Sequence, residues 1–507
     1  MKRHGIAKVG SIIGKVAKRT IQDYEYTRTR IPEWTVSPDG YFLLHHINIV
    51  DVENGELKKE RAILVKGKKI AKLVHDIDLK EVASTYKIEE SIDGENKFLI
   101  PGMSDLHCHI SLISEFDMTP GSFYYHDAQR ERACEAALMS GVTFIKDAGG
   151  AYDMVHTLMG EIENNRLLGP KILPTYETLS CKHGMWDLGP IMNTFSPIIF
   201  GGHVLNFAKD EADIRTFVNK VVSLGSQNLK IYLEERPLYG GNEDTYYDMF
   251  PDEQIQLFKN LAAEHGLPVE SHAMFIKGAR LAIKHHVTNI AHLTVDAPYT
   301  FMDAEDMVKN NVGIAPTTGV GMMLSFNYGS EGTSGNPEVV FYRNVLDNVM
   351  RPLMDFATIP EIRHCYINFW KFISEEMKFR KMPEIGQVYP ERAHGFAIHA
   401  KESFKNFTST GVKIGMGTDG GIGVSFPGIL AGEFVIYEHY DMTPAEILKC
   451  ATLTNMEILG LDKQLGSLVE GKYADMVLLN TNPLESVNAI QSINKVFKDG
   501  RLYVDNT

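Results

Sequence analysis

The sequence predicts an α/β protein whose main domain is a closed barrel of eight parallel strands. Two observations lead to this fold class. Strand-like runs alternate with helix-like runs through the middle of the chain, whereas both chain ends carry short β-rich segments. Such alternation is typical of parallel sheets covered by helices. An open, doubly wound sheet is the rival prediction, but no GxGxxG motif follows the first strand.

Each predicted barrel strand is a short run of mainly apolar or β-branched residues. The eight runs are 103–109, 142–148, 171–179, 228–234, 268–273, 289–294, 313–318 and 413–419. Helical periodicity separates most of these runs, as in 252–265 and 276–286. We therefore assign residues 99–455 to the barrel domain.

The two segments that flank this domain have similar patterns. Residues 41–75 and 465–506 both consist of short β-rich runs joined by turns that contain glycine. Strands from the two chain ends can pair in one small sheet. We therefore expect a second, β domain built from residues 36–98 together with residues 456–507.

One connection of the predicted barrel is too long for a simple loop. Residues 319–412 separate the last two strands, and on a barrel they would emerge at the catalytic face. We interpret this insertion as a lid or substrate-pocket subdomain, with an oligomerisation element as the alternative. Its Arg351, Arg363 and Arg392 could pair with a substrate carboxylate, although solvated helix faces are the preferred interpretation.

Composition and charge exclude several classes of protein. The chain has 507 residues and a net charge of -14, which argues against general nucleic-acid binding because counterion release needs a basic surface. No apolar run is long enough to span a membrane. The basic extension at residues 1–35 either packs or frays, or binds a membrane surface as an amphipathic arm. Five scattered cysteines indicate reduced thiols, so we expect a cytoplasmic protein. Separately, we expect a homo-oligomer that acts on a small molecule.

Histidines and an aspartate stand at the ends of several predicted strands. The stretch GMSDLHCHIS places His107 and His109 on one side of the first strand, because alternate residues share a face. His272, His292 and Asp419 close later strands, and all these strand ends face one mouth of a parallel barrel. Each residue alone has an ordinary explanation, such as packing or a helix N-cap. Together they predict a metal site suited to zinc, with manganese, iron or cobalt as alternatives.

Lys230 lies in the fourth predicted strand, NLKIYLE. A protonated lysine beside a divalent metal ion is repelled. Carboxylation by CO2 would instead turn the amine into an anion whose two oxygens can bridge two ions. If it is so modified, Lys230 therefore favours a two-metal site. The alternative is a lysine that extends from the barrel wall with its charge in water.

These ordered motifs resemble those of the metal-dependent amidohydrolase superfamily. The matching elements are DLHCH, NLKIY, ESHA, NIAH and GTDGG, and the tail GSLVEGKYADMVLL is similar to the closing β-segment of the superfamily. The resemblance spans residues 45–505 and implies a distorted TIM (β/α)8 barrel with a small β-sandwich domain from both termini. It also implies two divalent ions, with these ligands: His107, His109 and Asp419 on one ion, His272 and His292 on the other, and carboxylated Lys230 between them.

Within the superfamily, one branch is particularly similar. Residues 140–150 and 169–180 resemble the branch that holds Xaa-Pro and Xaa-Arg dipeptidases and imidazolone- or enamide-type hydrolases. That branch often carries Gly-Gly-His-Gly after the third strand. Here the run is SCKHGMWD, in which His183 and Gly184 are kept but Lys182 replaces a glycine. We expect this loop to border the substrate, so the dipeptide specificity of that branch cannot be assigned directly to this chain.

The hypothesis for function is a metal-dependent hydrolase that uses a metal-bridging hydroxide to cleave an amide C–N bond. Its substrate would be small, such as a dipeptide, an N-acyl amino acid or a cyclic amide. Asp419 would accept the proton and pass it to the leaving nitrogen. Tyr232, on the same strand face as Lys230, and His183 are substrate-binding candidates, with core packing and a plain loop histidine as alternatives. Asp147 could orient a neighbouring ligand or cap a helix.

Two other hypotheses stay open. A mononuclear deaminase of the same superfamily would lack the bridging lysine and would carry an acidic residue soon after the fifth-strand histidine. Here three apolar residues follow His272. A non-catalytic scaffold relative would have lost metal ligands, whereas every expected ligand position in this chain is filled.

Overall fold

The structure is a computed structural model of the chain. It describes residues 27–112, 125–187, 189, 193, 202–236, 246–324, 335–360, 363, 390–421 and 425–507. Most of the predicted N-terminal extension, a large part of the 319–412 insertion and the side chain of Arg392 lie outside the described residues. Among the helices that are described, none combines the length and the apolar character that a membrane crossing requires.

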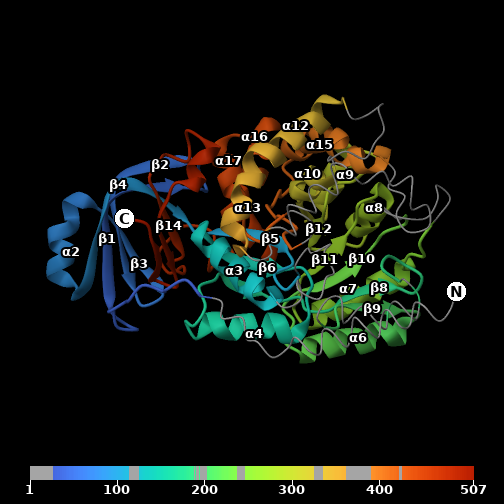
Figure 1. Ribbon diagram of the computed structural model, residues 1–507, viewed down its shortest axis with the longest axis horizontal. Helices are drawn as coiled ribbons and strands as arrows, with labels where there is room; N and C mark the ends of the chain where they lie inside the picture. The colour runs from blue at the N-terminus through green and yellow to red at the C-terminus, as the bar shows by residue number, and fades with distance from the viewer. Residues whose placement is uncertain are drawn as a thin grey trace.

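Strands from both chain ends form one seven-stranded sheet, in the order β16-β15-β14-β4-β1-β2-β3. Its strands are β1 (Tyr41–Asp51), β2 (Glu56–Lys66), β3 (Lys69–His75), β4 (Ile88–Pro101), β14 (Met476–Leu479), β15 (Ile493–Lys498) and β16 (Arg501–Asp505). The two ends meet where β4 pairs antiparallel with β14, with Leu99 opposite Leu478. Figure 1 shows this sheet at one end of the molecule. The chain ends therefore pair as expected, whereas a separate β-sandwich domain stays a prediction.

Two parallel sheets carry most of the strands predicted for the middle of the chain. One has the order β13-β12-β11-β10-β8-β9 and the other the order β5-β6-β7. Their strands are β5 (Met103–Cys108), β6 (Val142–Asp147), β7 (Lys171–Leu173), β8 (Thr178–Cys181), β9 (Leu205–Ala208), β10 (Leu229–Tyr232), β11 (Val269–His272), β12 (Asn289–Ala291) and β13 (Gly313–Ala315). The predicted run 171–179 is thus divided into β7 and β8, and β9 was not predicted. Every residue of β10 to β13 is buried, as expected of parallel strands that are covered on both faces.

The eighth predicted run, 413–419, is not a regular strand. It lies beside both parallel sheets through isolated parallel bridges, one between Ile314 and Ile414 and one between Cys108 and Gly420. The described chain is therefore a mixed α/β fold in which the sheets are not continuous with one another. Closure of all eight runs into one barrel stays a prediction.

Helices cover the parallel sheets. They are α3 (His126–Met139), α4 (Tyr152–Glu163), α6 (Glu211–Ser223), α7 (Asp252–Glu264), α8 (Ile276–Lys284), α9 (Phe301–Lys309), α10 (Thr318–Leu324), α12 (Pro337–Val345), α13 (Arg351–Ala357), α15 (Pro390–Thr410), α16 (Ala431–His439), α17 (Pro444–Lys449) and α18 (Asn455–Leu459); α2 (Leu79–Thr85) lies beside the seven-stranded sheet. The predicted helices 252–265 and 276–286 correspond to α7 and α8. In Figure 1, α4 and α6 run along one side of the molecule, and α12, α13, α15 and α16 lie toward the other.

The buried Asp105 carboxylate fastens the irregular eighth run to β5. Its Oδ1 accepts hydrogen bonds from the backbone nitrogens of Thr418 (3.0 Å) and His107 (3.1 Å). Its Oδ2 accepts from Thr418 Oγ1 (2.6 Å) and from the Gly428 nitrogen (2.9 Å). One side chain thus ties together the two segments that carry His107 and Asp419.

We expect Asp105→Asn to lower the free energy of unfolding by about 2–3 kcal/mol, because an amide would turn one acceptor into a donor facing two buried donors. Urea unfolding followed by fluorescence measures the change. Asp306→Asn on the exposed face of α9 is the matched control and should change stability by less than about 0.5 kcal/mol. Equal stability of the two variants would contradict the fastening role of Asp105.

Candidate metal centre

Three strands each present two polar side chains on one face, within or directly after their carboxyl-terminal halves; β10 and β11 are neighbours, and β5 belongs to the other parallel sheet. The pairs are His107 with His109, Lys230 with Tyr232, and Glu270 with His272. The two members of each pair are two residues apart, which places them on the same side of a strand. The register of β10 and β11 sets Lys230 beside Glu270 and Tyr232 beside His272. Strand periodicity and register therefore concentrate polar groups at one place.

The first predicted ligand group does come together. Asp419 Oδ1 lies 3.1 Å from His107 Nε2 and 3.3 Å from His109 Nε2. Lys230 Nζ lies 3.5 Å from the same His107 Nε2. All four side chains are buried. Residues separated by more than three hundred positions thus meet in one small volume.

The second pair of histidines adjoins the first group. The imidazole rings of His272 and His292 lie 4.5 Å apart, and those of His292 and His107 lie 5.1 Å apart, between centroids. One ligand atom from each of His107, His292 and Asp419 falls within 4.8 Å of the others, a spacing compatible with one metal ion. The structure therefore brings all six predicted ligands into one connected cluster.

Outer hydrogen bonds orient two of the imidazoles, and a third faces a carboxylate. His109 Nδ1 is hydrogen-bonded to the Gly149 carbonyl at 2.7 Å, whereas His107 Nδ1 lies 2.9 Å from Glu270 Oε1 without forming a hydrogen bond of good geometry. His292 Nδ1 is 2.7 Å from Thr317 Oγ1, whose own proton is donated to the Pro316 carbonyl. His292 Nδ1 is therefore the donor in that contact. Partners on Nδ1 leave the Nε2 lone pairs free to bind a metal ion.

Three non-glycine residues at the centre adopt left-handed backbone conformations. They are His292 (φ 81°), Asp419 (φ 51°) and Thr317 (φ 49°). Such conformations cost of order 1–3 kcal/mol each and tend to cluster at functional sites. Each of these residues turns the chain at the end of a strand or extended run. The left-handed backbone conformation therefore helps to set the direction of the side chain, together with the strand register.

Burial and neighbouring charge keep the imidazoles neutral. The pKa values of His107, His272 and His292 are lowered well below 6.5, mainly by burial and further by the Lys230 ammonium. Burial also lowers the pKa of Lys230 to about 8, although Asp419 and Asp147 oppose the shift. Neutral imidazole is the form that binds a metal ion.

Glu270 and Lys146 are central residues that the sequence analysis missed. Both side chains are fully buried and form an ion pair with each other. Glu270 Oε1 also lies 3.2 Å from Lys230 Nζ. One carboxylate thus balances two buried lysines and contacts His107. Its position two residues before His272 on the same strand was the available signal, because that spacing places both on one face.

An unpartnered nitrogen of His272 indicates that the cluster can hold a metal ion. Its Nε2 is buried and has no hydrogen-bond partner among the described residues, although Glu234 Oε2 lies 3.3 Å away. Burying an unpaired polar atom is costly. A metal ion would satisfy this nitrogen together with the inward Nε2 atoms of the other histidines. The donor set of imidazole and carboxylate is also the set that zinc and related ions accept.

The secondary candidates lie in different surroundings. Tyr232 is buried beside His272, with ring centroids 5.2 Å apart, and burial raises its pKa to about 12. Asp147 accepts a hydrogen bond from the Ile110 nitrogen and so holds the chain directly after His109. His183 follows β8 with 72% of its side chain exposed. In the described part of the chain, no contact links His183 to the cluster.

Two of the three insertion arginines named as candidates are described, and both lie in exposed or half-buried ion pairs. Arg351 is 2.8 Å from Asp347, and Arg363 is 2.7 Å from Asp355. These pairs agree with the solvated-face interpretation of the insertion arginines.

Buried imidazoles and a carboxylate at the ends of parallel strands are the arrangement that the resemblance to the amidohydrolase superfamily implies. Residues 400–503 match the Amidohydrolase family. Aspergillus niger ochratoxinase is 22% identical over 476 residues, which cover 89% of this chain and 84% of that protein.

Solved structures show the same fold over nearly the whole chain. The crystal structure of A. niger ochratoxinase has a TM-score of 0.67 at 19% identity and covers 92% of this chain and 96% of its own. A Xaa-Pro dipeptidase with methionine bound in its active site has a TM-score of 0.66 at 18% identity, over 92% and 100% of the two chains. The predicted resemblance to the amidohydrolase superfamily, and with it the predicted enzyme class, is confirmed.

We expect Glu270→Gln to weaken zinc binding at this cluster by about ten- to a hundredfold, because His107 loses its charged outer partner. Competition with a chromophoric chelator measures the affinity. Glu264→Gln, at an exposed position at the end of α7, is the matched control and should bind zinc as the unmodified protein does. Unchanged affinity in Glu270→Gln would show that this carboxylate does not support the site.

Proposed function

We propose that this protein is a metal-dependent hydrolase that cleaves an amide C–N bond in a small substrate. The observation that carries the proposal is the buried convergence of His107 and His109 with Asp419, beside His272 and His292. The names of the similar proteins, an ochratoxinase and a Xaa-Pro dipeptidase, support the same class of reaction. Dipeptides, N-acyl amino acids and cyclic amides are the substrates that we expect.

We assign the metal ligands as the motifs imply, with His107, His109 and Asp419 on one divalent ion and His272 and His292 on a second. Carboxylated Lys230 would lie between the two ions. Zinc is the expected metal, with manganese, iron or cobalt as alternatives. Bound ions of this kind lower the pKa of water and polarise a carbonyl oxygen.

Asp419 is the proposed general base and acid. Its carboxylate would accept a proton from the attacking water as the new C–O bond forms. It would then give that proton to the leaving nitrogen as the C–N bond breaks, so that the products are a carboxylic acid and an amine. Its backbone is fixed by a hydrogen bond from its nitrogen to the His107 carbonyl at 2.7 Å, which keeps the carboxylate near the reacting atoms.

Lys230 has the surroundings that carboxylation requires. Only a neutral amine reacts with CO2, and a lysine with a pKa of about 8 has about one amine in ten neutral at pH 7. The carbamate nitrogen keeps one hydrogen, which Glu270 Oε1 could accept from its position 3.2 Å away. Lys146 would help to balance the added negative charge because it pairs with the same carboxylate.

Tyr232 and His183 are the proposed substrate contacts. Tyr232 stays protonated because its pKa is raised to about 12, so it can donate a hydrogen bond to an oxyanion beside His272. His183 is exposed in the loop after β8 and could contact the outer part of a substrate.

The proposal also includes the domain architecture of the chain. Residues 99–455 would close into a distorted (β/α)8 barrel, and residues 36–98 with 456–507 would form the small β-sandwich domain. The isolated bridges at Ile414 and Gly420 support closure, because they join the irregular eighth run to β13 on one side and to β5 on the other.

A hydrolysis screen tests the proposed function directly. We expect the zinc-loaded protein to hydrolyse at least one member of a panel of dipeptides, N-acyl amino acids and cyclic imides, to lose activity in a chelator and to regain it with zinc. Asp419→Asn should reduce kcat by at least about a thousandfold, because it removes both the proton acceptor and a ligand. Asp306→Asn is the control that should retain activity. Full activity of Asp419→Asn would refute the assignment.

A carbon-13 experiment tests the carboxylation of Lys230. Protein equilibrated with 13C-bicarbonate should show one carbamate resonance, and its formation in metal-free protein should rise between pH 7 and pH 9 as the Lys230 ammonium loses its proton. Lys230→Gln should abolish the resonance, whereas the exposed-surface control Lys309→Gln should keep it. A resonance that persists in Lys230→Gln would place the carbamate elsewhere.

A further inference from the structure

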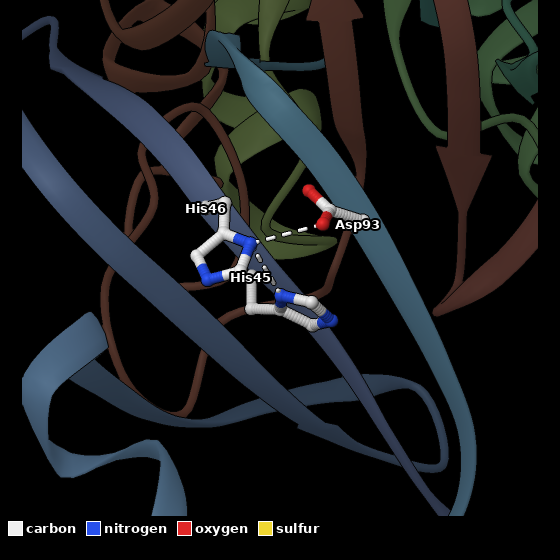
Figure 2. Close-up of side chains that lie close together, drawn as sticks. All are labelled: His45, His46 and Asp93. Carbon is white, nitrogen blue, oxygen red and sulfur yellow. Dashed lines mark hydrogen bonds and ion pairs between the residues drawn. The ribbon is translucent and has the colours of Figure 1, made fainter.

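A second group of metal-ligating side chains lies on the seven-stranded sheet, away from the candidate metal centre. It consists of His45 and His46 on β1 and Asp93 on the neighbouring strand β4, as Figure 2 shows. One ligand atom from each residue falls within 4.8 Å of the others. The parallel pairing of the two strands sets His45 directly beside Asp93.

An irregularity in β1 brings the two histidines together. Consecutive residues of a regular strand point to opposite faces, so His45 and His46 would normally diverge. Here the pairing register shifts between Leu44 and Ile47, and His46 adopts a left-handed conformation with φ 50°. As a result the two Nδ1 atoms lie 3.1 Å apart. Bulges of this kind re-aim side chains and are common next to functional sites.

A single proton on His46 Nδ1 cannot form a hydrogen bond to both of its close neighbours. His46 Nδ1 lies 3.1 Å from His45 Nδ1 and 3.0 Å from Asp93 Oδ2. A proton on His46 Nδ1 can point along one of these two lines, and Figure 2 shows that the lines diverge. A proton supplied by His45 would instead leave the His46 lone pair facing the Asp93 carboxylate. One cation among the three atoms removes this conflict.

The backbone nearby fixes the carboxylate for such a role. Asp93 Oδ1 accepts a hydrogen bond from the Glu95 nitrogen at 2.8 Å, which leaves Oδ2 directed at His46. A second carboxylate, Asp76, accepts from the His46 nitrogen at 3.2 Å and adds negative charge beside the pair. Outer contacts that orient a ligand are typical of metal sites.

We propose that His45, His46 and Asp93 bind one divalent transition-metal ion, with zinc as the probe of first choice. Two imidazoles and a carboxylate suit zinc, cobalt and nickel. Bonds of about 2.0–2.1 Å to a tetrahedral ion place ligand atoms about 3.3–3.4 Å apart. The two spacings that involve His46 Nδ1, 3.1 Å and 3.0 Å, need to widen by only a few tenths of an ångström, and the ligand atoms of His45 and Asp93 lie within 4.8 Å of each other. The side chains of His46 and Asp93 are 43% and 53% exposed, which leaves the fourth position to water.

The bound ion would link β1 to β4 at the point where their pairing is irregular. Strand β4 continues through Gly102 into β5, which carries His107. The ion is therefore expected to stabilise the sheet from which the first ligand strand of the centre emerges. This site does not depend on the proposed hydrolytic function.

Equilibrium dialysis of the full-length protein against buffered, low-micromolar free zinc tests the proposal. The variant His45→Gln/His46→Asn removes both imidazoles, and asparagine tolerates the positive φ at position 46. We expect it to bind one zinc ion per chain fewer than the unmodified protein. The matched control is His265→Gln/His286→Asn, whose residues are exposed and whose position 286 also has a positive φ of 52°; it should bind as many ions as the unmodified protein.

Three results would overturn the proposal. Equal zinc content in both variants would mean that the group is a hydrogen-bonded histidine pair only. A loss of more than one ion would mean that the site is not independent of the centre, and an equal loss in the control would mean non-specific binding. If the first variant does not fold, Asp93→Asn keeps both imidazoles and should weaken zinc binding at this site at least tenfold, and unchanged affinity there would equally contradict the proposal.

Discussion

The Glu270 carboxylate lies between two buried lysines and an imidazole, and the arrangement of the centre depends on this balance of charge. A lone buried charge costs several kcal/mol, and the Glu270 carboxylate offsets part of this cost for Lys146 and for the ammonium form of Lys230. Because Glu270 pairs with Lys146, contacts Lys230 and faces His107, one residue connects β6, β10, β11 and β5. The polar cluster is therefore a single network, and the neutral imidazoles are a consequence of its burial and of its lysines.

Hydrogen bonds from residues around the centre orient its other side chains. Carbonyl and hydroxyl partners hold the outer nitrogens of His109 and His292, and the Asp105 carboxylate fastens the segment that bears Asp419. These contacts direct lone pairs inward before any ion is bound, which limits the reorganisation that metal binding needs. The surface group at His45 is also positioned by the backbone. There an irregularity in β1 brings the polar side chains together, whereas at the centre the ends of parallel strands do so.

Much of this arrangement could be predicted from the sequence, for physical reasons. The two-residue spacing in DLHCH fixes His107 and His109 on one face, and parallel strand ends must meet at one edge, so the six candidate ligands that come together could be named without coordinates. The run 413–419 looked like a strand by composition, but the close approach of its backbone to His107 and the left-handed turn at Asp419 leave it irregular. Lys146 was missed because a charged residue in an apolar strand is recognisable as buried only once its partner Glu270 is known. The bulge that pairs His45 with His46 depends on register between strands, which local sequence does not encode.

Anomalous X-ray scattering at the zinc edge, from crystals of the zinc-loaded protein, tests the central claim most directly. Two peaks should lie among the inward Nε2 atoms, one beside His107, His109 and Asp419 and the other beside His272 and His292, with density for a carbamate on Lys230 between them. Ordered side chains with no peak in this cluster, or a single peak next to an unmodified Lys230 amine, would contradict a two-ion centre.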